Sequence, residues 1–222
     1  MPSVYDDDAK VGDLTRQVVN AGYRVLQIHK LGETDREHVA ALLEHFDPPR
    51  GAHILDAGCG VGEVARLMAE ARPDLDFTLL NISPAQLAMC PKAMEKKEGR
   101  LEEMPFGDAC FDAVMINYAL GHADLEPTLS EAARVLRRNG VLFIYDMTAD
   151  PDQDCLVASM QYQLHSSDEV ATCAKLHGLV LNRKVDPETN MKDFTSIVRD
   201  DEVHKLLATV RPIVYRFVKV CD

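Results

Sequence analysis

A glycine-rich turn between two apolar segments restricts the fold of this chain more than any other feature of its sequence. The apolar run from His53 to Ala57 leads into Gly58, Gly60 and Gly62. The next apolar residues recur at the spacing of one helix face, and they are Val64, Leu67, Met68 and Ala71. A side chain at the glycines would block both a tight turn and the approach of a ligand to the backbone. The pattern predicts a strand, a ligand-binding turn and a helix in succession.

Further apolar runs and helix signals alternate after this unit. Strands are predicted at Phe77 to Asn81, Ala113 to Asn117 and Val141 to Tyr145. Ser83-Pro84-Ala85-Gln86 has the residues of a helix start, with Ser as the N-cap and Pro as the first helical residue. A second helix is predicted from Leu129, Ala132, Ala133 and Leu136, with its end at Arg137, Arg138 and the turn pair Asn139-Gly140. Because parallel strands need crossovers, the alternation predicts a doubly wound α/β sheet covered on both faces.

The segments on either side of this alternation carry weaker signals. Asp13 to Phe46 is expected to be helical throughout and to end at Asp47-Pro48-Pro49. Beyond Asp146, Ser167-Asp168 is expected to cap a helix that reaches about His177. Two strands with a loop and a short helix between them complete the expectation, at Leu179 to Val185 and at Ile213 to Val220. Residues 1–222 are expected to form one domain, since this length suits a single core.

Composition narrows the classes of function. The formal net charge of -12 repels phosphate backbones, which disfavours nucleic acid as a partner. No apolar stretch is long enough to cross a bilayer, and the N-terminal segment has the acidic run Asp6-Asp7-Asp8, so we expect a cytoplasmic protein without a membrane partner. No metal-ligand motif is present, and we expect no metal site. The cysteines are far apart in the sequence and are expected to be reduced: Cys59, Cys90, Cys110, Cys155, Cys173 and Cys221.

Three ordered segments carry a resemblance to a known family. Ile54-Leu55-Asp56-Ala57-Gly58-Cys59-Gly60-Val61-Gly62 resembles motif I of the class I S-adenosylmethionine-dependent methyltransferases. Two later segments stand in the family's order, namely Glu102-Glu103-Met104-Pro105-Phe106 with Phe111-Asp112-Ala113-Val114, and Ala133-Arg134-Val135-Leu136-Arg137-Arg138-Asn139-Gly140. The resemblance implies a Rossmann-like sheet, mostly parallel with an antiparallel last strand. It also implies an N-terminal helical lid over residues 1–49, a core over residues 50–222, and S-adenosylmethionine as cofactor.

The resemblance assigns cofactor-binding roles to particular residues. Gly58 and Gly60 would pass beneath the methionine and ribose portions, and Asp56 would organise the turn and the cofactor's amino group. Asn81 stands where the family has an acidic ribose ligand, and an asparagine can accept one hydrogen bond and donate another. Arg100 stands where relatives have an aspartate for the adenine amino group, although arginine has no acceptor. The complete predicted set is Asp56, Gly58, Cys59, Gly60, Asn81, Ile82, Leu101, Glu102 and Asn117, with Leu101 and Glu102 at the adenine.

The loop from Asn117 to Asp124 follows a strand, at the edge where open α/β sheets place ligands. His122 is a candidate general base for an oxygen or nitrogen acceptor, or a residue that only packs beside the cofactor. Tyr118 either orients the acceptor or covers the sheet edge. Tyr23 and His29, in the predicted lid, are expected to be structural.

The acceptor stays open at this level. Asn81 to Gln86 is similar to sterol and isoprenoid C-methyltransferases, but Tyr118 to Gly121 lacks the glutamate that those enzymes use. We therefore expect methylation of an O, N or C atom of a small molecule. A nucleic-acid base methyltransferase is an alternative, although Asp47-Pro48-Pro49-Arg50 lacks the aromatic residue of the base-binding motif. A non-catalytic cofactor-binding regulator is another. A homodimer is a candidate assembly, and the oligomeric state stays open.

Overall fold

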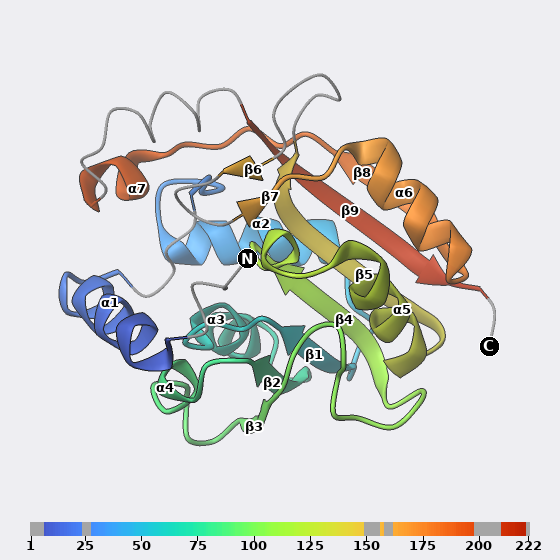
Figure 1. The fold of residues 1–222 in the computed structure, drawn as a ribbon, viewed down its shortest axis with the longest axis horizontal. Coiled ribbons are helices and arrows are strands. Elements are labelled where there is room, and N and C mark those ends of the chain that lie inside the picture. The colour runs from blue at the N-terminus through green and yellow to red at the C-terminus, as the bar shows by residue number, and fades with distance from the viewer. Residues whose placement is uncertain (1–6, 24–27, 149–155, 158–161, 198–209, 221–222) are drawn as a thin grey trace.

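The computed structural model describes residues 7–23, 28–148, 156–157, 162–197 and 210–220, and its central element is one seven-stranded sheet (Figure 1). The strand order is β3-β2-β1-β4-β5-β9-β8. The strands are β1 (His53–Ala57), β2 (Asp76–Asn81), β3 (Glu95–Glu98), β4 (Phe111–Asn117), β5 (Leu136–Thr148), β8 (Leu179–Val185) and β9 (Arg211–Lys219). The first five strands in this order, from β3 through β2, β1 and β4 to β5, pair in parallel. Strand β9 runs antiparallel to both of its neighbours, β5 and β8. The expected Rossmann-like sheet with an antiparallel last strand is confirmed.

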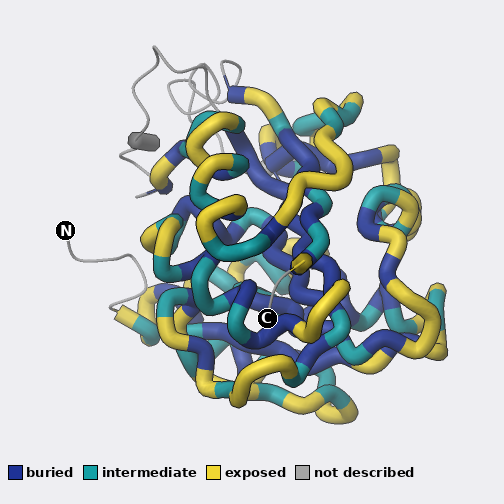
Figure 2. The backbone as a smooth tube through the Cα atoms, turned by 90° about the vertical axis from the view of Figure 1, so that its right-hand side faces the viewer, coloured by how far each residue is buried: buried dark blue, intermediate teal, exposed yellow. Residues whose placement is uncertain are grey.

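Helices cover both faces of the sheet. They are α1 (Asp8–Asn20), α2 (Asp35–Phe46), α3 (Glu63–Ala71), α4 (Pro84–Leu87), α5 (Leu125–Val135), α6 (Ser167–Leu176) and α7 (Lys192–Ile197), with a 3-10 turn η2 (Leu120–His122). Two short strands, β6 (Leu156–Val157) and β7 (Tyr162–Gln163), pair with each other. Figure 2 shows buried backbone through the middle of the molecule and exposed backbone on the outer turns.

Alternate residues of each central strand face two separate apolar layers. On β1, Leu55 packs in the layer that contains α5 and α6, whereas Ile54 packs in the layer that contains α2 and α3. Every residue of β1 after His53 is buried. Near-continuous apolar strands are what a parallel sheet covered on both faces requires, which is why the short runs in the sequence indicated strands correctly.

The predicted continuous helix from Asp13 to Phe46 is wrong. Helix α1 ends at Asn20 and α2 begins only at Asp35. Gly22 and Gly32 adopt positive φ angles of 96° and 71°, which a helix cannot contain. A capping box between Thr34 and Glu37 then starts the second helix.

Two predicted helix boundaries are also corrected. Helix α5 ends at Val135, two residues before Arg137, because Leu136 is extended and pairs with Phe111 of β4. Arg137 and Arg138 therefore belong to β5 rather than to a helix end. Ser166, not Ser167-Asp168, caps α6, since its side chain accepts from the Glu169 amide and Glu169 returns the bond.

The remaining expectations near the C-terminus are mostly met. Strand β8 has the predicted bounds, and the last strand begins two residues earlier than Ile213 and ends one residue before Val220. The expected short helix is α7. The charged run Arg199-Asp200-Asp201-Glu202 lies outside the described residues.

Candidate functional site

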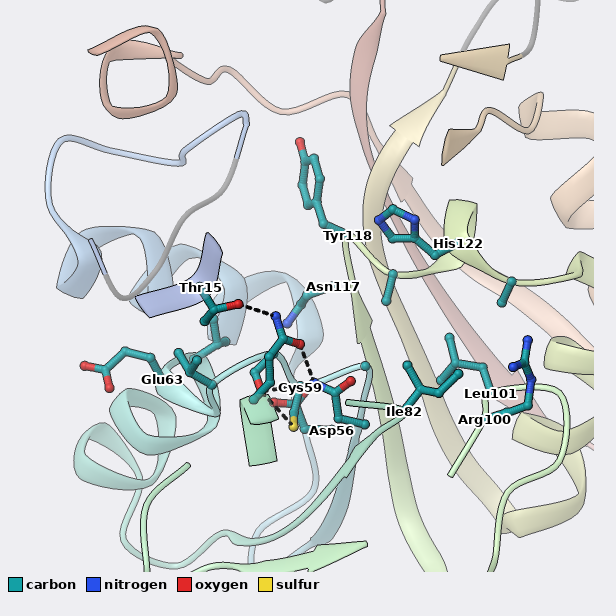
Figure 3. Close-up of a pocket in the computed structure, with 18 of the residues that line it drawn as sticks. Thr15, Asp56, Cys59, Glu63, Ile82, Arg100, Leu101, Asn117, Tyr118 and His122 are labelled. Carbon is teal, nitrogen blue, oxygen red and sulfur yellow. Dashed lines mark hydrogen bonds between the residues drawn. The ribbon is translucent and has the colours of Figure 1, made fainter. Parts of the chain in front are cut away.

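A pocket of about 390 Å³ opens at the carboxyl ends of β1, β2 and β4, under helix α1 (Figure 3). This size is within the usual range for small-molecule sites. The structure brings all of the predicted site residues together in its lining: Asp56, Gly58, Cys59, Gly60, Asn81, Ile82, Leu101, Glu102, Asn117, Tyr118 and His122. Parallel strands place their carboxyl ends at one edge of the sheet, which explains why residues more than 60 positions apart meet there.

The glycine turn after β1 forms the floor of the pocket. The amides of Gly58 and Cys59 both donate to the Leu80 carbonyl of β2, over 2.9 and 3.0 Å. Gly58 and Gly60 have positive φ angles of 83° and 56°. A Cβ atom on Gly58 would lie 2.4 Å from Cβ of Ala119, whereas one on Gly60 would meet no atom within 4 Å. Gly58 is therefore required by packing, and Gly60 leaves open space on the pocket side.

Asp56 is a buried carboxyl beside this turn. It is the fourth residue of β1 and has an exposed fraction of 2%. Burial raises its pKa to about 7, because a charged carboxylate is poorly solvated there. A cation that entered the pocket would reverse this effect and favour the ionised form.

Asn117 is the least satisfied polar side chain of the pocket. It ends β4, has an exposed fraction of 8%, and neither Nδ2 nor Oδ1 has a hydrogen-bond partner among the residues that the structure describes. Leaving a buried polar group unpaired costs about 1–3 kcal/mol, so native structures rarely keep such groups without a reason. An amide that offers both a donor and an acceptor to the pocket is suited to a polar ligand.

Tyr118 follows in a left-handed conformation, with φ of 50°, which is uncommon for a residue other than glycine. Its hydroxyl lies 2.8 Å from Nδ1 of His29. Burial raises the pKa of Tyr118 well above its usual value and lowers the pKa of His29 to about 4. Both side chains are therefore neutral, and the tautomer of His29 sets which of the two atoms donates. His29 thus anchors Tyr118, a link that the sequence did not indicate.

His122 lies in η2 on the same side of the pocket as Tyr118 (Figure 3). Its ring packs edge-on against the Tyr162 ring with centroids 4.7 Å apart. Asp146 supports this loop, since its carboxylate accepts from the Leu120 amide over 3.1 Å and from the Tyr162 hydroxyl. Sequence reasoning assigned no role to Asp146 or Tyr162, although an acidic residue at the end of an apolar strand is a signal.

The side of the pocket where the sequence predicted the adenine contacts is polar, and two of its charged side chains pair with each other. Arg100 and Leu101 line it together with Glu102 (Figure 3). The Nε atom of Arg100 lies 3.6 Å from Oε2 of Glu102, and the other Glu102 oxygen accepts from the Asp124 amide over 3.3 Å.

Helix α1 contributes lining residues that sequence reasoning missed. Four lie at positions that share a helix face: Leu14, Thr15, Val18 and Val19. Tyr23, which the sequence led us to expect in a structural role, follows the helix and also lines the pocket. Gln86 from α4 also lines the pocket. The i, i+4 spacing of Leu14 with Val18 and of Thr15 with Val19 is a signal that could have identified this face.

The described ranges contain neither a candidate metal cluster nor a candidate membrane-spanning helix. Within those residues, no group of three or more His, Cys, Asp or Glu side chains could hold a metal ion. No helix in the same part of the chain is long and apolar enough to cross a membrane. Cys59, Cys90, Cys110 and Cys173 are free thiols, and Cys155 and Cys221 lie outside the described residues.

Comparisons with known proteins agree with this geometry. A family model described as a methyltransferase domain matches residues 55–144. The demethylmenaquinone methyltransferase of Thermotoga maritima is 32% identical over 116 residues, which are 50% of this chain and 49% of that protein. The malonyl-(acyl-carrier protein) O-methyltransferase of Dechloromonas aromatica is 28% identical over 170 residues, which are 72% of this chain and 62% of that protein. The chain thus spans about half of the first relative and less than two thirds of the second.

A solved structure has the same fold over nearly its whole length. Geranyl diphosphate methyltransferase, in complex with GPP and sinefungin, superposes with a TM-score of 0.80 at 18% identity. The match covers 97% of this chain and 99% of that chain. It includes the N-terminal and C-terminal regions beyond residues 55–144.

Proposed function

We propose that this protein is a class I S-adenosylmethionine-dependent methyltransferase that transfers the methyl group of S-adenosylmethionine to a small-molecule acceptor, because a methyltransferase-domain model matches residues 55–144. The observation that carries the proposal is Asn117, which lines the pocket and whose buried amide has no hydrogen-bond partner within the described part of the chain. The relatives with quinone and acyl-carrier substrates support a small-molecule acceptor.

The residues present fit the cofactor. Asp56 would hold the ammonium group as an ion pair, and the Asn117 amide would pair with the amino-acid end. Gly58 and Gly60 would let the backbone pass beneath the ligand without side chains. Asn81, Ile82, Leu101 and Glu102 would border the nucleoside, and Cys59 would lie beside it.

When bound, S-adenosylmethionine supplies a methyl group on a positively charged sulfur, and this methyl is the electrophile. The protein's contribution is to orient the acceptor in line with the methyl and to exclude water. The apolar residues of α1 cover the pocket and support this exclusion. A lone pair of the Tyr118 oxygen would accept a hydrogen bond from the acceptor and so position it. His122 would take the proton of an oxygen or nitrogen acceptor on a ring nitrogen.

The binding test compares Asp56→Ala with His122→Ala by calorimetric titration of S-adenosylhomocysteine. Loss of the ion pair should weaken binding at least tenfold in Asp56→Ala, whereas His122→Ala should stay within about twofold of wild type, since a hydrogen bond to a charged group contributes about 1.5–3 kcal/mol. Equal affinities in both variants and wild type would refute the assignment of the site.

The activity test measures S-adenosylhomocysteine formation across a panel of small hydroxyl, amine and activated-carbon acceptors. Turnover with one class would identify the acceptor atom. A noncatalytic regulator instead predicts cofactor binding without turnover, and Asn81 and Arg100, which depart from the family pattern, are the residues that favour it. A flat titration with wild type would overturn both the enzyme and the regulator.

A further inference from the structure

A chain of hydrogen bonds joins the glycine turn to the lid helix α1 (Figure 3). Asn81 Nδ2 donates to the Gly60 carbonyl over 3.1 Å and to Gln86 Oε1 over 2.9 Å. Gln86 Nε2 donates to Thr15 Oγ1 over 3.0 Å, and Thr15 Oγ1 donates to the Val11 carbonyl over 2.8 Å. The chain thus runs from the floor of the pocket to its roof through three side chains.

Backbone groups fix the direction of every bond in this chain. The Ser83 amide can only donate, and it donates to Asn81 Oδ1 over 3.2 Å. The other end of the Asn81 amide is therefore Nδ2, which suits the Gly60 carbonyl because a carbonyl can only accept. Gln86 must then present its oxygen to Asn81 and its nitrogen to Thr15. The hydroxyl of Thr15 is left to donate to Val11, so all of the donors and acceptors agree.

Other contacts hold α1 against α4 without reaching the turn. The Asp8 carboxylate accepts from the Ser83 hydroxyl over 2.5 Å and from the Ala85 amide over 3.2 Å. Gly12 lets the two elements approach closely, since a Cβ atom there would lie 2.8 Å from Cβ of Ala85. These contacts dock the helix, whereas the Asn81 chain connects that docking to Gly60. The Cys90 thiol is a second, longer contact of this turn, since its Sγ lies 3.5 Å from the Gly60 carbonyl oxygen and 3.6 Å from the Gln86 carbonyl oxygen.

We propose that Asn81 is a positioning residue that couples docking of the lid helix to the shape of the cofactor turn, through Gln86 and Thr15. The inference rests on the proposed cofactor site. Binding of the cofactor and docking of α1 over it are then linked. Docking of α1 must raise the affinity for the cofactor by the same factor by which the bound cofactor raises the equilibrium constant for docking. The asparagine at this position has a role that an acidic ribose ligand could not have, because a carboxylate has no hydrogen to donate to Gly60.

This role predicts an unusual result for Asn81→Asp, which introduces the acid that the family has there. A carboxylate would repel the Gly60 carbonyl and would force the Gln86 amide to turn over, so Thr15 would face an oxygen in place of a donor. If the side chain at this position simply bound the ribose, the acid should bind the cofactor as well as or better than the amide. If Asn81 positions the turn, the acid should bind it worse.

The experiment titrates wild type, Asn81→Asp, Thr15→Val and the double variant with S-adenosylhomocysteine. Hydrogen exchange of residues 8–20 is followed with and without this ligand. We expect at least tenfold weaker binding for Asn81→Asp and about fivefold for Thr15→Val, the usual effect of one hydrogen bond. The double variant should resemble Asn81→Asp, because the chain is already broken. Ligand-induced protection of α1 should be reduced in all three.

Matched controls isolate the chain from general effects of each substitution. Thr195 makes the same bond to the carbonyl four residues earlier, at Met191 over 3.0 Å. It is exposed in α7 and is not among the residues that line the pocket. Thr195→Val should leave both readouts unchanged. Asn182→Asp adds the same charge at an exposed site where Oδ1 only accepts, from Arg216 over 2.8 Å, and it too should behave as wild type.

The outcomes separate this inference from the proposed function. Wild-type affinity in Asn81→Asp, or effects of the two substitutions that multiply in the double variant, would overturn the coupling and leave the cofactor site standing. No binding by wild type would overturn the proposed function and the coupling together. Thr15→Val removes one half-buried hydroxyl from the pocket-lining face of α1, so it keeps the test decisive even if Asn81→Asp does not fold.

Discussion

The glycine turn yields the sharpest prediction, because three glycines with positive φ differ in what surrounds them. Gly51, Gly58 and Gly60 have φ angles of 70°, 83° and 56°. A Cβ atom would meet nothing within 4 Å at Gly51 or Gly60, but at Gly58 it would lie 2.4 Å from Cβ of Ala119. Only Gly58 and Gly60 line the pocket. Substitution by alanine therefore separates backbone strain, a steric clash and loss of ligand space.

The magnitudes follow from these surroundings. Each alanine in a left-handed conformation costs about 1–2 kcal/mol, and this is the whole expected loss of unfolding free energy for Gly51→Ala and Gly60→Ala. Gly58→Ala adds an overpacking cost of about 1–3 kcal/mol, because the Ala119 backbone must move. For a chain of this length, each kcal/mol lowers the melting temperature by about 2–4 °C. Gly60→Ala should therefore have the same melting temperature as Gly51→Ala. Of these two variants, only Gly60→Ala should bind S-adenosylhomocysteine at least tenfold more weakly than wild type.

Far-UV circular dichroism on heating is the stability assay, since the chain has no tryptophan to report unfolding by fluorescence. Calorimetric titration measures affinity. If Gly60→Ala binds S-adenosylhomocysteine as tightly as Gly51→Ala does, the open space at Gly60 is not where the ligand lies. If Gly58→Ala is as stable as Gly51→Ala, the contact with Ala119 yields without cost and the packing argument is wrong.

Three further predictions test the pocket and its supports. Burial raises the pKa of Asp56 to about 7, and only the carboxylate form pairs with an ammonium. Affinity for S-adenosylhomocysteine should therefore fall as the pH drops from 8 to 6. The affinity of Asp56→Asn should be nearly independent of pH over that range. Gly121→Ala would place a Cβ atom 2.2 Å from Tyr162 Cε1 and should lower the melting temperature by several degrees. Gly107→Ala, whose Cβ atom would have its nearest contact at 3.5 Å, should not lower it. Equal melting temperatures in the two variants would show that Tyr162 can move. Lys30 is buried and pairs with Asp35 and Asp193, so Lys30→Met should lower the free energy of unfolding in urea by about 3 kcal/mol. Lys192→Met removes the exposed pair with Glu33 and should lower it by less than about 1 kcal/mol. Similar losses in the two variants would refute the role given to burial.

Lys30 also shows why the sequence did not predict the break between α1 and α2. Helical spacing within Asp13 to Phe46 is a local signal, and it correctly indicated helix at both ends of the segment. The break between them depends on partners far away, since the Lys30 backbone pairs with Asn190 and its side chain reaches Asp193. A window along the chain contains neither residue, so periodicity alone extended one helix across the gap.

The start of β5 has a similar explanation. Leu136 continues the apolar spacing of α5, and the spacing indicated helix. Its backbone instead pairs with Phe111, and its carbonyl accepts from Lys219 Nζ over 2.8 Å. Bonds to two other strands favour the extended conformation over one more residue of helix, and those strands become neighbours only when the sheet forms.

What the sequence by itself determined was the strand, turn and helix around Asp56 to Gly62, and with them the edge of the sheet where a pocket must open. These signals are local, because glycine conformation, capping and apolar period act within a few residues. Tertiary structure alone decided how the predicted residues are used. It left the Asn117 amide unpaired in the pocket, placed Tyr118 against His29, and turned Asn81 toward Gly60 and Gln86. A side chain's role depends on which distant groups can donate to it or accept from it, and only the folded chain brings those groups within hydrogen-bond distance.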